Sequence, residues 1–150
     1  MVQKFESHVR DTSDIIKRVE GTEFHSDQEI LVTLDIEALY TNIPQQAAIQ
    51  AVEQVLLRYP GDRPNKFILD CLEIVLTKNF FEFEDKLYQQ LKGVSIGASC
   101  APNVANAFMC IFEEQHIFNE VAPFYENIRS WSRYIDDIFF IWTGEPTDLT

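Results

Sequence analysis

The sequence predicts an α+β domain built on an antiparallel sheet, and three observations lead to that prediction. Runs of β-favouring residues alternate with amphipathic helical segments along the chain, as in domains whose helices pack on an antiparallel sheet. Apolar residues make up 46% of the 150 residues and aromatic residues 13%, a composition typical of a packed globular protein. A chain of this length can bury one hydrophobic core, so a single domain is expected.

The first half of the chain contains three predicted elements. Residues 11–14 (DTSD) can cap a short helix that continues to Val19, because their side chains accept hydrogen bonds from the first helical amides. Residues 30–36 (ILVTLDI) form a short apolar run, which predicts a buried central strand that delivers Asp35 to the rim of a sheet. Residues 45–59 place apolar side chains on one face and predict an amphipathic helix that ends before a Pro-Gly pair.

The rest of the chain predicts two more helices and a hairpin. Asn65 is expected to cap a helix whose apolar positions extend to Val75. Residues 80–83 (FFEF) and 87–90 (LYQQ) flank a polar turn, the pattern of a β-hairpin. Residues 102–118 predict another helix, with a proline tolerated in its first turn.

A pair of adjacent acids lies inside the last apolar run, residues 133–142 (RYIDDIFFIW). The flanking aromatic and β-branched residues predict a hairpin with Asp136 and Asp137 at its turn. Two anions in such a setting are costly unless a cation compensates them, and Mg²⁺ binds carboxylate and phosphate oxygens together. The alternative is that both acids are ordinary turn residues.

Asp35 is a third acid in a comparable setting, at the end of an apolar strand. One strand-end acid and one acid pair form the arrangement that two-metal phosphoryl transfer requires, with carboxylates bridging two ions about 4 Å apart. The alternative for Asp35 is a loop acid or a helix N-cap just after the strand.

Three segments, in the family's order, resemble the catalytic motifs of reverse transcriptases in the form used by Penelope-like retroelements. They are residues 34–44 (LDIEALYTNIP), 93–109 (GVSIGASCAPNVANAFM) and 133–137 (RYIDD). The resemblance extends from about residue 8 to the end of the chain. It implies that residues 30–150 form a polymerase palm core, truncated and without a thumb, and that residues 1–29 are an N-terminal helical remnant of the fingers.

The resemblance also implies the residues of a metal site. Asp35 and Asp136 would be the main ligands of two Mg²⁺ ions, with Mn²⁺ as a substitute and the Ile36 carbonyl as an extra ligand. Asp137 would be the less direct acid. Adjacent strand residues point to opposite faces, so Asp136 and Asp137 can bind one ion only if the turn is distorted.

The same resemblance assigns residues to nucleotide and template. Tyr40 would be a steric gate beneath the incoming sugar, although a core aromatic is the alternative. Gly93 and Gly97 would allow close approach of the backbone to the nucleotide or template base. Contacts with template or primer are expected from Lys92 and Tyr134.

Net charge limits what this chain can do alone. It has 12 basic and 24 acidic residues, a net charge of −12, which is the wrong sign for a free-standing nucleic-acid binder. The charge therefore indicates a catalytic centre without the basic regions that grip nucleic acid, and the resemblance implies an RNA template, a DNA primer and dNTP as partners. Basic fingers, a thumb and an endonuclease are expected in the full-length parent.

Two classes of function stay open on sequence alone. The first is a reverse transcriptase core that needs flanking regions for activity. The second is a domesticated or decayed retroelement remnant that acts as an interaction module. A nuclear location is expected only by resemblance to retroelements, and no apolar stretch reaches the ~18 residues that a membrane span needs.

Overall fold

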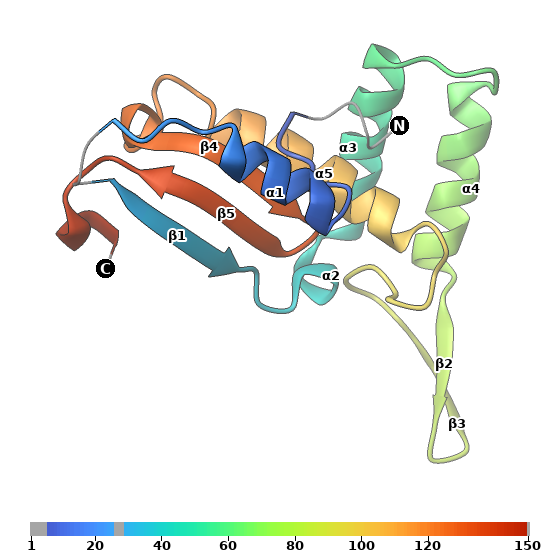
Figure 1. Cartoon of the computed structure of the whole chain (residues 1–150). Helices are drawn as coiled ribbons and strands as arrows, with labels where there is room; N and C mark the ends of the chain where they lie inside the picture. Colours follow the sequence, from blue (N-terminus) through green and yellow to red (C-terminus); the bar gives the residue numbers. More distant parts are fainter. Residues whose placement is uncertain (1–5, 26–28, 150) are drawn as a thin grey trace. The chain divides into compact units, whose positions relative to one another are not determined.

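The computed structural model describes residues 6–25 and 29–149. The described residues divide into two compact units, one formed by residues 38–111 and the other by residues 6–25, 29–37 and 112–149. The units are called the helical unit and the sheet unit below, and each is described by itself (Figure 1). The boundary predicted from the sequence, between residues 29 and 30, lies inside the sheet unit.

The sheet unit is built on three antiparallel strands. They are β1 (Ile30–Asp35), β4 (Ile128–Tyr134) and β5 (Asp137–Trp142), in the spatial order β1-β5-β4. The prediction that residues 30–36 form a buried central strand is wrong, because β1 is at the edge of the sheet and none of its residues is buried. The centre belongs to β5, whose apolar run pairs on both sides and suits burial on both faces.

One face of this sheet carries a hydrophobic core. Ile138, Phe140 and Trp142 alternate along β5 and are buried together. Partly buried side chains from the other strands and their ends pack against these three, namely Ile30, Val32, Ile36, Ile128 and Trp131. The ring of Trp131 stacks on Phe140 with 5.2 Å between centroids, which fixes β4 against β5 on this side.

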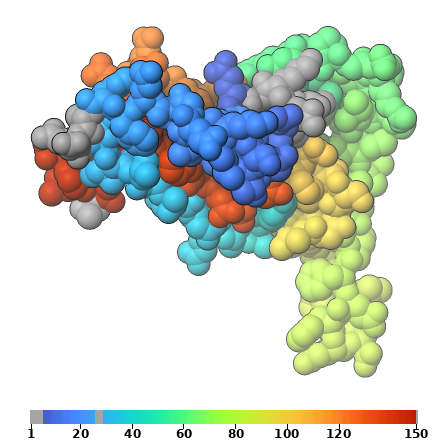
Figure 2. All heavy atoms as spheres, viewed as in Figure 1, coloured from blue at the N-terminus to red at the C-terminus, as the bar shows by residue number. Residues whose placement is uncertain are grey.

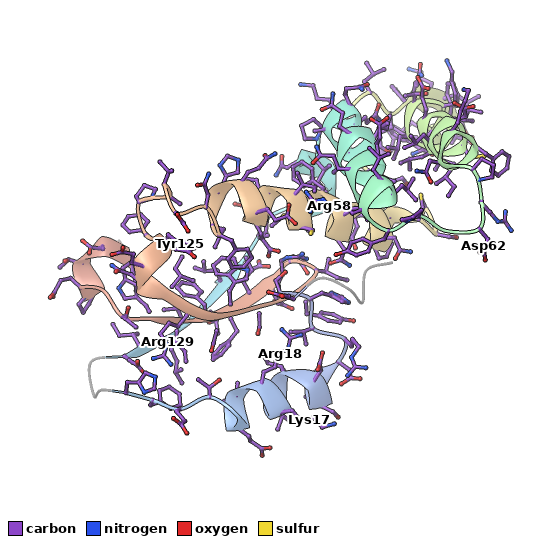
Figure 3. The ribbon with its side chains drawn as sticks, turned by 90° about the horizontal axis from the view of Figure 1, so that it is seen from above. Lys17, Arg18, Arg58, Asp62, Tyr125 and Arg129 are labelled. Carbon is purple, nitrogen blue, oxygen red and sulfur yellow. The ribbon has the colours of Figure 1, made fainter. Side chains whose placement is uncertain are left out.

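Helix α1 (Thr12–Glu20) lies over the strands of the sheet unit, as Figures 1 and 2 show in blue. The predicted cap is confirmed, since the Asp11 side chain accepts a hydrogen bond from the Asp14 amide at 2.9 Å. No residue of α1 is buried. Arg18 points toward the sheet and donates to the His8 carbonyl at 2.7 Å, whereas Lys17 points away (Figure 3).

A short N-terminal segment extends the sheet beyond β4. The Arg133 amide donates to the Ser7 carbonyl at 2.7 Å, and the Val9 amide donates to the Arg133 carbonyl at 2.8 Å. These bonds flank a parallel bridge between His8 and Arg133. The outer edge of β4 is thus paired beside Arg133, two residues before the acid-bearing turn.

The helical unit is formed mainly by α-helices. Its elements are α2 (Leu39–Asn42), α3 (Gln45–Arg58), α4 (Asn65–Thr77), β2 (Phe80–Phe83), β3 (Lys86–Gln89) and the first part of α5 (Ala101–His116). The buried face of α3 consists of Ala48, Ala51, Val52, Val55 and Leu56, as its apolar spacing predicts. The N-cap of α4 is Pro64 rather than Asn65, which is already helical and makes no capping bond. Two 3₁₀ helices, Tyr125–Asn127 and Pro146–Leu149, belong to the sheet unit.

The observed elements confirm the predicted α+β class, with an antiparallel sheet packed on helices and the acid-bearing hairpin near the end of the chain. Both predicted hairpins form. Within residues 6–25 and 29–149, no helix is both long and apolar enough to cross a membrane.

Candidate functional site

Two of the three predicted acids face each other at one end of the sheet. Asp35 is the last residue of β1, Asp137 is the first of β5, and the two are direct partners in the strand register. Directly opposed residues on neighbouring antiparallel strands have Cβ atoms about 4.5–5.5 Å apart on the same face. Both residues are exposed, so the pair presents two carboxylates to solvent.

The third acid lies in the turn between β4 and β5. Tyr134 pairs with Asp137, so Ile135 and Asp136 form a two-residue loop. The Asp136 carbonyl accepts a hydrogen bond from the Ile36 amide at 3.1 Å, which joins the loop to the residue after β1. The structure therefore brings all four predicted metal-site residues to one end of the sheet.

The loop also departs from regular strand geometry. Ile135 has φ 55°, in the left-handed region that a β-branched residue seldom adopts. Asp136 is a loop residue, so the strict alternation of side chains along a strand does not apply to it. The sequence predicted both acids in the turn, whereas Asp137 already belongs to β5, because a two-residue loop is enough to connect the strands.

The donor atoms at this end of the sheet suit a hard divalent cation. Carboxylate and carbonyl oxygens are the ligands that Mg²⁺ takes, and among the described residues none of the three acids has a cationic partner. The described part of the chain holds no cluster of three or more His, Cys, Asp or Glu side chains arranged to hold a metal ion. The residues thus fit the ion in the type of their donor atoms, whereas the described structure does not gather their side chains around a common point.

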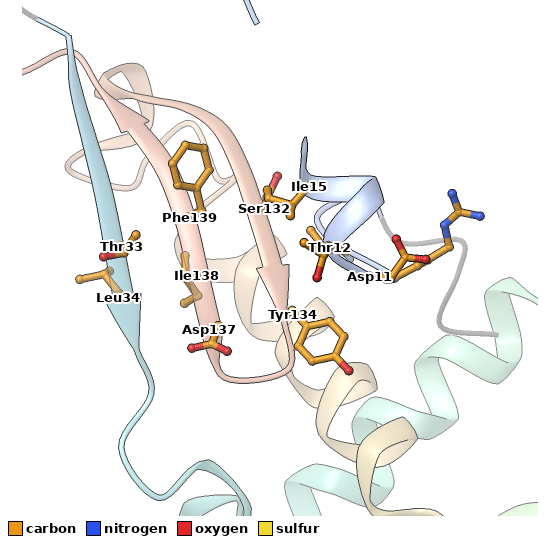
Figure 4. A pocket seen from close by; sticks show the side chains of 12 residues that line it. Asp11, Thr12, Ile15, Thr33, Leu34, Ser132, Tyr134, Asp137, Ile138 and Phe139 are labelled. Carbon is orange, nitrogen blue, oxygen red and sulfur yellow. The ribbon is translucent and has the colours of Figure 1, made fainter. Parts of the chain in front are cut away.

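A cavity of about 530 Å³ adjoins the acid end of the sheet. Figure 4 shows Asp137 and Tyr134 at its rim, near the turn, and Phe139 farther along β5. From the other side α1 contributes Thr12 and Ile15. The face that carries Asp137 is therefore hollowed and mostly apolar, bounded by a helix that buries none of its own residues.

The residues assigned to nucleotide contact lie mostly in the helical unit. The Val94 amide donates to the Tyr40 carbonyl at 2.7 Å, so the glycine turn is bonded to the segment that carries Tyr40. Gly93 has φ 76°, and a Cβ added there would lie 2.8 Å from both Cα and O of Thr41. Gly93 therefore permits a close approach of two segments of this chain to each other.

The other assigned residues are more open. Gly97 is exposed, and a Cβ added there would meet nothing within 4 Å. Lys92 is exposed next to Gly93, and its carbonyl accepts from the Gln90 side chain at 2.9 Å. Tyr134, in the sheet unit beside the acid turn, has a side chain that is 47% exposed.

Sequence reasoning missed a buried ion pair behind the acid turn. Arg133 is fully buried and Glu113 is 1% exposed, with 2.6 Å between Arg133 Nε and Glu113 Oε1. The only local signal was that each charged residue borders an apolar run, Glu113 after residues 107–112 and Arg133 at the start of residues 133–142. Nothing in the spacing showed that α5 and β4 would bring the two charges together.

Comparisons with known proteins support the fold. No family model and no curated protein matches the sequence. A structure of apo telomerase from Candida tropicalis matches with a TM-score of 0.72 at 13% identity, over 97% of this chain and 28% of that one. A form of that enzyme truncated from its C-terminal domain matches with a TM-score of 0.71 at 13% identity, over 96% and 31%. Telomerase from Candida albicans, in complex with a TWJ fragment of telomeric RNA, gives 0.71 at 12% identity, over 95% and 28%.

These likenesses show that the chain has a reverse-transcriptase-like fold, similar to that of part of the telomerase chain. They confirm the predicted fold class. The chain spans less than a third of each of these telomerase chains, and the identity is low. The likeness therefore establishes the fold alone.

Proposed function

We propose that this chain is the catalytic core of an RNA-directed DNA polymerase, which transfers a nucleotide from dNTP to a primer 3′-hydroxyl. The observation that supports this most strongly is the placement of the acids. Asp35 is in register with Asp137, and Asp136 lies in the adjoining loop, within a polymerase-like fold. The motif resemblance adds that the enzyme is of the Penelope-like type, with retroelement origin and nuclear residence.

The proposed site uses two Mg²⁺ ions, with Mn²⁺ as a substitute. When bound, such ions acidify the attacking hydroxyl and neutralise charge on the triphosphate. Asp35 and Asp136 would be the main ligands, supplemented by the Ile36 carbonyl. Asp137 would complete the carboxylate set from the face that it shares with Asp35. The hydrogen bond from the Ile36 amide to the Asp136 carbonyl would keep the two ligand segments together.

Nucleotide and template contacts complete the proposal. Tyr40 would exclude a ribose 2′-hydroxyl from the nucleotide site, and Gly93 supports it through the turn bonded to its carbonyl. Gly97 would leave room for the nucleotide, and Lys92 and Tyr134 would contact template or primer. Because the chain carries a net charge of −12, most of the grip on RNA and DNA would come from other regions of the full-length parent.

Primer extension tests the proposal directly. The full-length parent, given an RNA template, a DNA primer, dNTP and Mg²⁺, should extend the primer, and Asp136→Asn should abolish extension. Asp70→Asn is the matched control, because Asp70 is an exposed acid on α4 paired with Lys66 and should leave extension unchanged. Extension that survives Asp136→Asn would refute the proposed site.

Sugar selectivity tests the role of Tyr40. Tyr40→Ala should raise the incorporation of ribonucleotides relative to deoxyribonucleotides, because the ring would no longer block the 2′-hydroxyl. The ratio of kcat/KM for the two nucleotide classes measures this. An active variant with unchanged selectivity would mean that Tyr40 is a packing residue.

The second candidate is an inert remnant that serves as an interaction module. It is favoured by the hairpin of β2 and β3, in which every strand residue is exposed. Phe81 and Tyr88 stack on each other there with 5.6 Å between centroids, and both are at least 42% exposed. A folded parent protein that extends no primer, and captures a partner through this hairpin, would support the second candidate.

A further inference from the structure

The buried pair of Arg133 and Glu113 is hard to explain as a stabilising element alone. Burying two charges costs several kcal/mol per ion, and their attraction often does no more than offset that cost. A pair with 0% and 1% exposure of its side chains therefore suggests a second role. That role can be sought in what the two side chains touch.

The Glu113 carboxylate is held by three side chains. Arg133 donates from Nε to Oε1 at 2.6 Å and from Nη2 to Oε2 at 3.4 Å. The Ser7 hydroxyl donates to Oε2 at 2.6 Å, and Trp131 Nε1 donates to Oε1 at 2.9 Å. A carboxylate with four donors has little rotational freedom, so Glu113 is a fixed anchor for the guanidinium.

The main chain of Arg133 is fixed as well. Its amide and carbonyl bond to Ser7 and Val9 on the outer edge of β4. The guanidinium then has a third contact, because Nη1 donates to the Ile135 carbonyl at 3.1 Å. One buried side chain therefore joins the anchor on α5 to the first residue of the acid-bearing loop.

Ile135 is a residue that needs such support. Its φ of 55° is strained for a β-branched residue, and two-residue hairpin loops usually place Gly, Asn or Asp where φ is positive. Strain of this kind persists where the surroundings over-determine the conformation. The charge-assisted bond from Arg133 to the Ile135 carbonyl is such a constraint.

The constrained residue directly precedes Asp136. If the peptide of Ile135 rotated, the Asp136 carbonyl would move away from the Ile36 amide that it binds at 3.1 Å. The loop would then lose its link to the end of β1, where Asp35 lies. The conformation of Ile135 thus decides where Asp136 stands relative to Asp35.

We propose that Arg133, anchored by Glu113, is a positioning residue that holds the Ile135–Asp136 loop in its strained conformation and so sets the geometry of the acid site. The guanidinium fork is essential to this role, because it reaches the carboxylate and the carbonyl with different nitrogens. The expected effect of Arg133 on metal binding rests on the proposed function. Its expected effect on the order of the Ile135–Asp136 loop does not.

Amide hydrogen exchange on this chain measures the loop directly. The reporter is the Ile36 amide, and the reference is the set of hydrogen-bonded amides in the middle of β5. In Arg133→Lys, a single nitrogen can reach Glu113 but not Ile135 as well. The Ile36 amide should exchange about tenfold faster or more, the loss expected for one charged hydrogen bond.

Two further variants keep the test decisive. Arg129→Lys is the matched control, since Arg129 lies on the same strand and pairs with Glu29 without touching the loop, and it should leave the Ile36 amide unchanged. Ser7→Ala removes one donor from Glu113 and leaves both charges in place, so it remains informative even if Arg133→Lys fails to fold. It should speed Ile36 exchange by about threefold.

Ile135→Gly tests whether the Arg133–Glu113 pair is needed because Ile135 has a strained positive φ. Glycine adopts positive φ without steric cost, so the loop should depend less on Arg133 in this background. Arg133→Lys should then change Ile36 exchange by less than about half its factor in the wild-type background, which a double-mutant cycle measures. Equal factors in both backgrounds would break the proposed link.

The outcomes separate the role of Arg133 from the proposed function. Faster exchange confined to Ile36 and the loop supports positioning; unchanged exchange, or an equal rise across β5, overturns it. Binding of Mn²⁺, followed by water-proton relaxation, should weaken about tenfold in Arg133→Lys, in step with the loss of loop order. If wild type binds no Mn²⁺, the metal site of the proposed function fails, while exchange still decides the role of Arg133.

Discussion

The β2–β3 and β4–β5 hairpins both turn through residues with positive φ, but they differ in how far the surrounding structure supports the turn. The β2–β3 hairpin turns through Glu84 and Asp85, with φ of 50° and 59°, and the β4–β5 hairpin turns through Ile135 with φ 55°. Every strand residue of the first hairpin is exposed. The second has a mostly buried central strand and a buried ion pair bonded to its loop.

The difference shows where strain is maintained by tertiary structure. Asp85 belongs to the few residue types besides glycine that adopt the left-handed region readily, Glu84 does not, and both residues are exposed. At Ile135, the least suited residue type, the surroundings include Arg133, Glu113 and Ser7. The hairpin with the acids is therefore the more strongly determined of the two, as a site that needs fixed ligands requires.

Removing the Glu113 carboxylate should give the largest loss of stability. Glu113→Ala leaves Arg133 buried without its carboxylate, which should lower the free energy of unfolding by about 3–5 kcal/mol. Urea unfolding followed by tryptophan fluorescence measures this. Asp70→Ala, which breaks an exposed pair on α4, should cause no measurable change. A loss below about 1 kcal/mol for Glu113→Ala would mean that the pair contributes little.

Two glycines offer a similar contrast between crowded and open backbone. Gly93→Ala forces a Cβ to within 2.8 Å of Thr41 at a positive φ, and should cost about 2 kcal/mol or more. Gly97→Ala places its Cβ in open space and should stay within about 0.5 kcal/mol of wild type. Thermal unfolding of both variants measures the contrast, and equal losses would contradict the crowding at Gly93.

The stability of the β2–β3 hairpin should rise when its turn residues are replaced. Replacing Glu84 with Asn and Asp85 with Gly supplies the residues that a loop with two positive φ values prefers. We expect a gain of about 0.5–1 kcal/mol in stability of the helical unit, measured by chemical unfolding. No gain, together with unchanged exchange of the β2 and β3 amides, would mean that this turn does not limit the stability of its hairpin.

The smallest expected effect is a pH dependence near the ion pair. Burial, and then the positive charges of Arg133 and Arg18, lower the pKa of His8 below its ordinary value of 6.5. The unfolded chain therefore binds a proton at His8 that the folded chain resists. Stability is retained above pH 6.5 and falls as the pH drops from there toward the lowered pKa of the folded state.

A comparison of wild type with His8→Gln isolates the contribution of His8 to the pH dependence of stability. Urea midpoints between about pH 7.5 and 5.5 should fall more steeply for wild type than for His8→Gln. His25→Gln, at an exposed histidine, should follow wild type. Parallel curves for wild type and His8→Gln would show that His8 does not titrate with folding.

Much of the secondary structure could be predicted because local signals agree with the final fold. The apolar spacing of residues 45–59 and the following Pro-Gly pair gave α3 to within one residue at its end. Runs of aromatic and other apolar residues on both sides of a polar turn predicted both hairpins. The order of the strands could not be predicted, because an apolar run such as residues 30–36 is compatible with an edge strand as well as with a central one.

The acid site was predicted in its residue types and incompletely in its geometry. The sequence indicated that Asp35, Asp136 and Asp137 belong together. It did not reveal that Asp137 is the register partner of Asp35, because register depends on pairing between segments about a hundred residues apart in sequence. The pair of Arg133 and Glu113 was invisible for the same reason, since only packing brings the two buried charges together.

Binding of Mn²⁺ to the chain itself, in the presence of dNTP, is the most direct test that the acid end of the sheet is a catalytic metal site. Water-proton relaxation should report binding by wild type, strong weakening in Asp35→Asn and Asp136→Asn, and no change in Asp70→Asn. Binding that is equal in all four proteins, or absent from a folded wild type, would contradict the assignment of these acids as metal ligands.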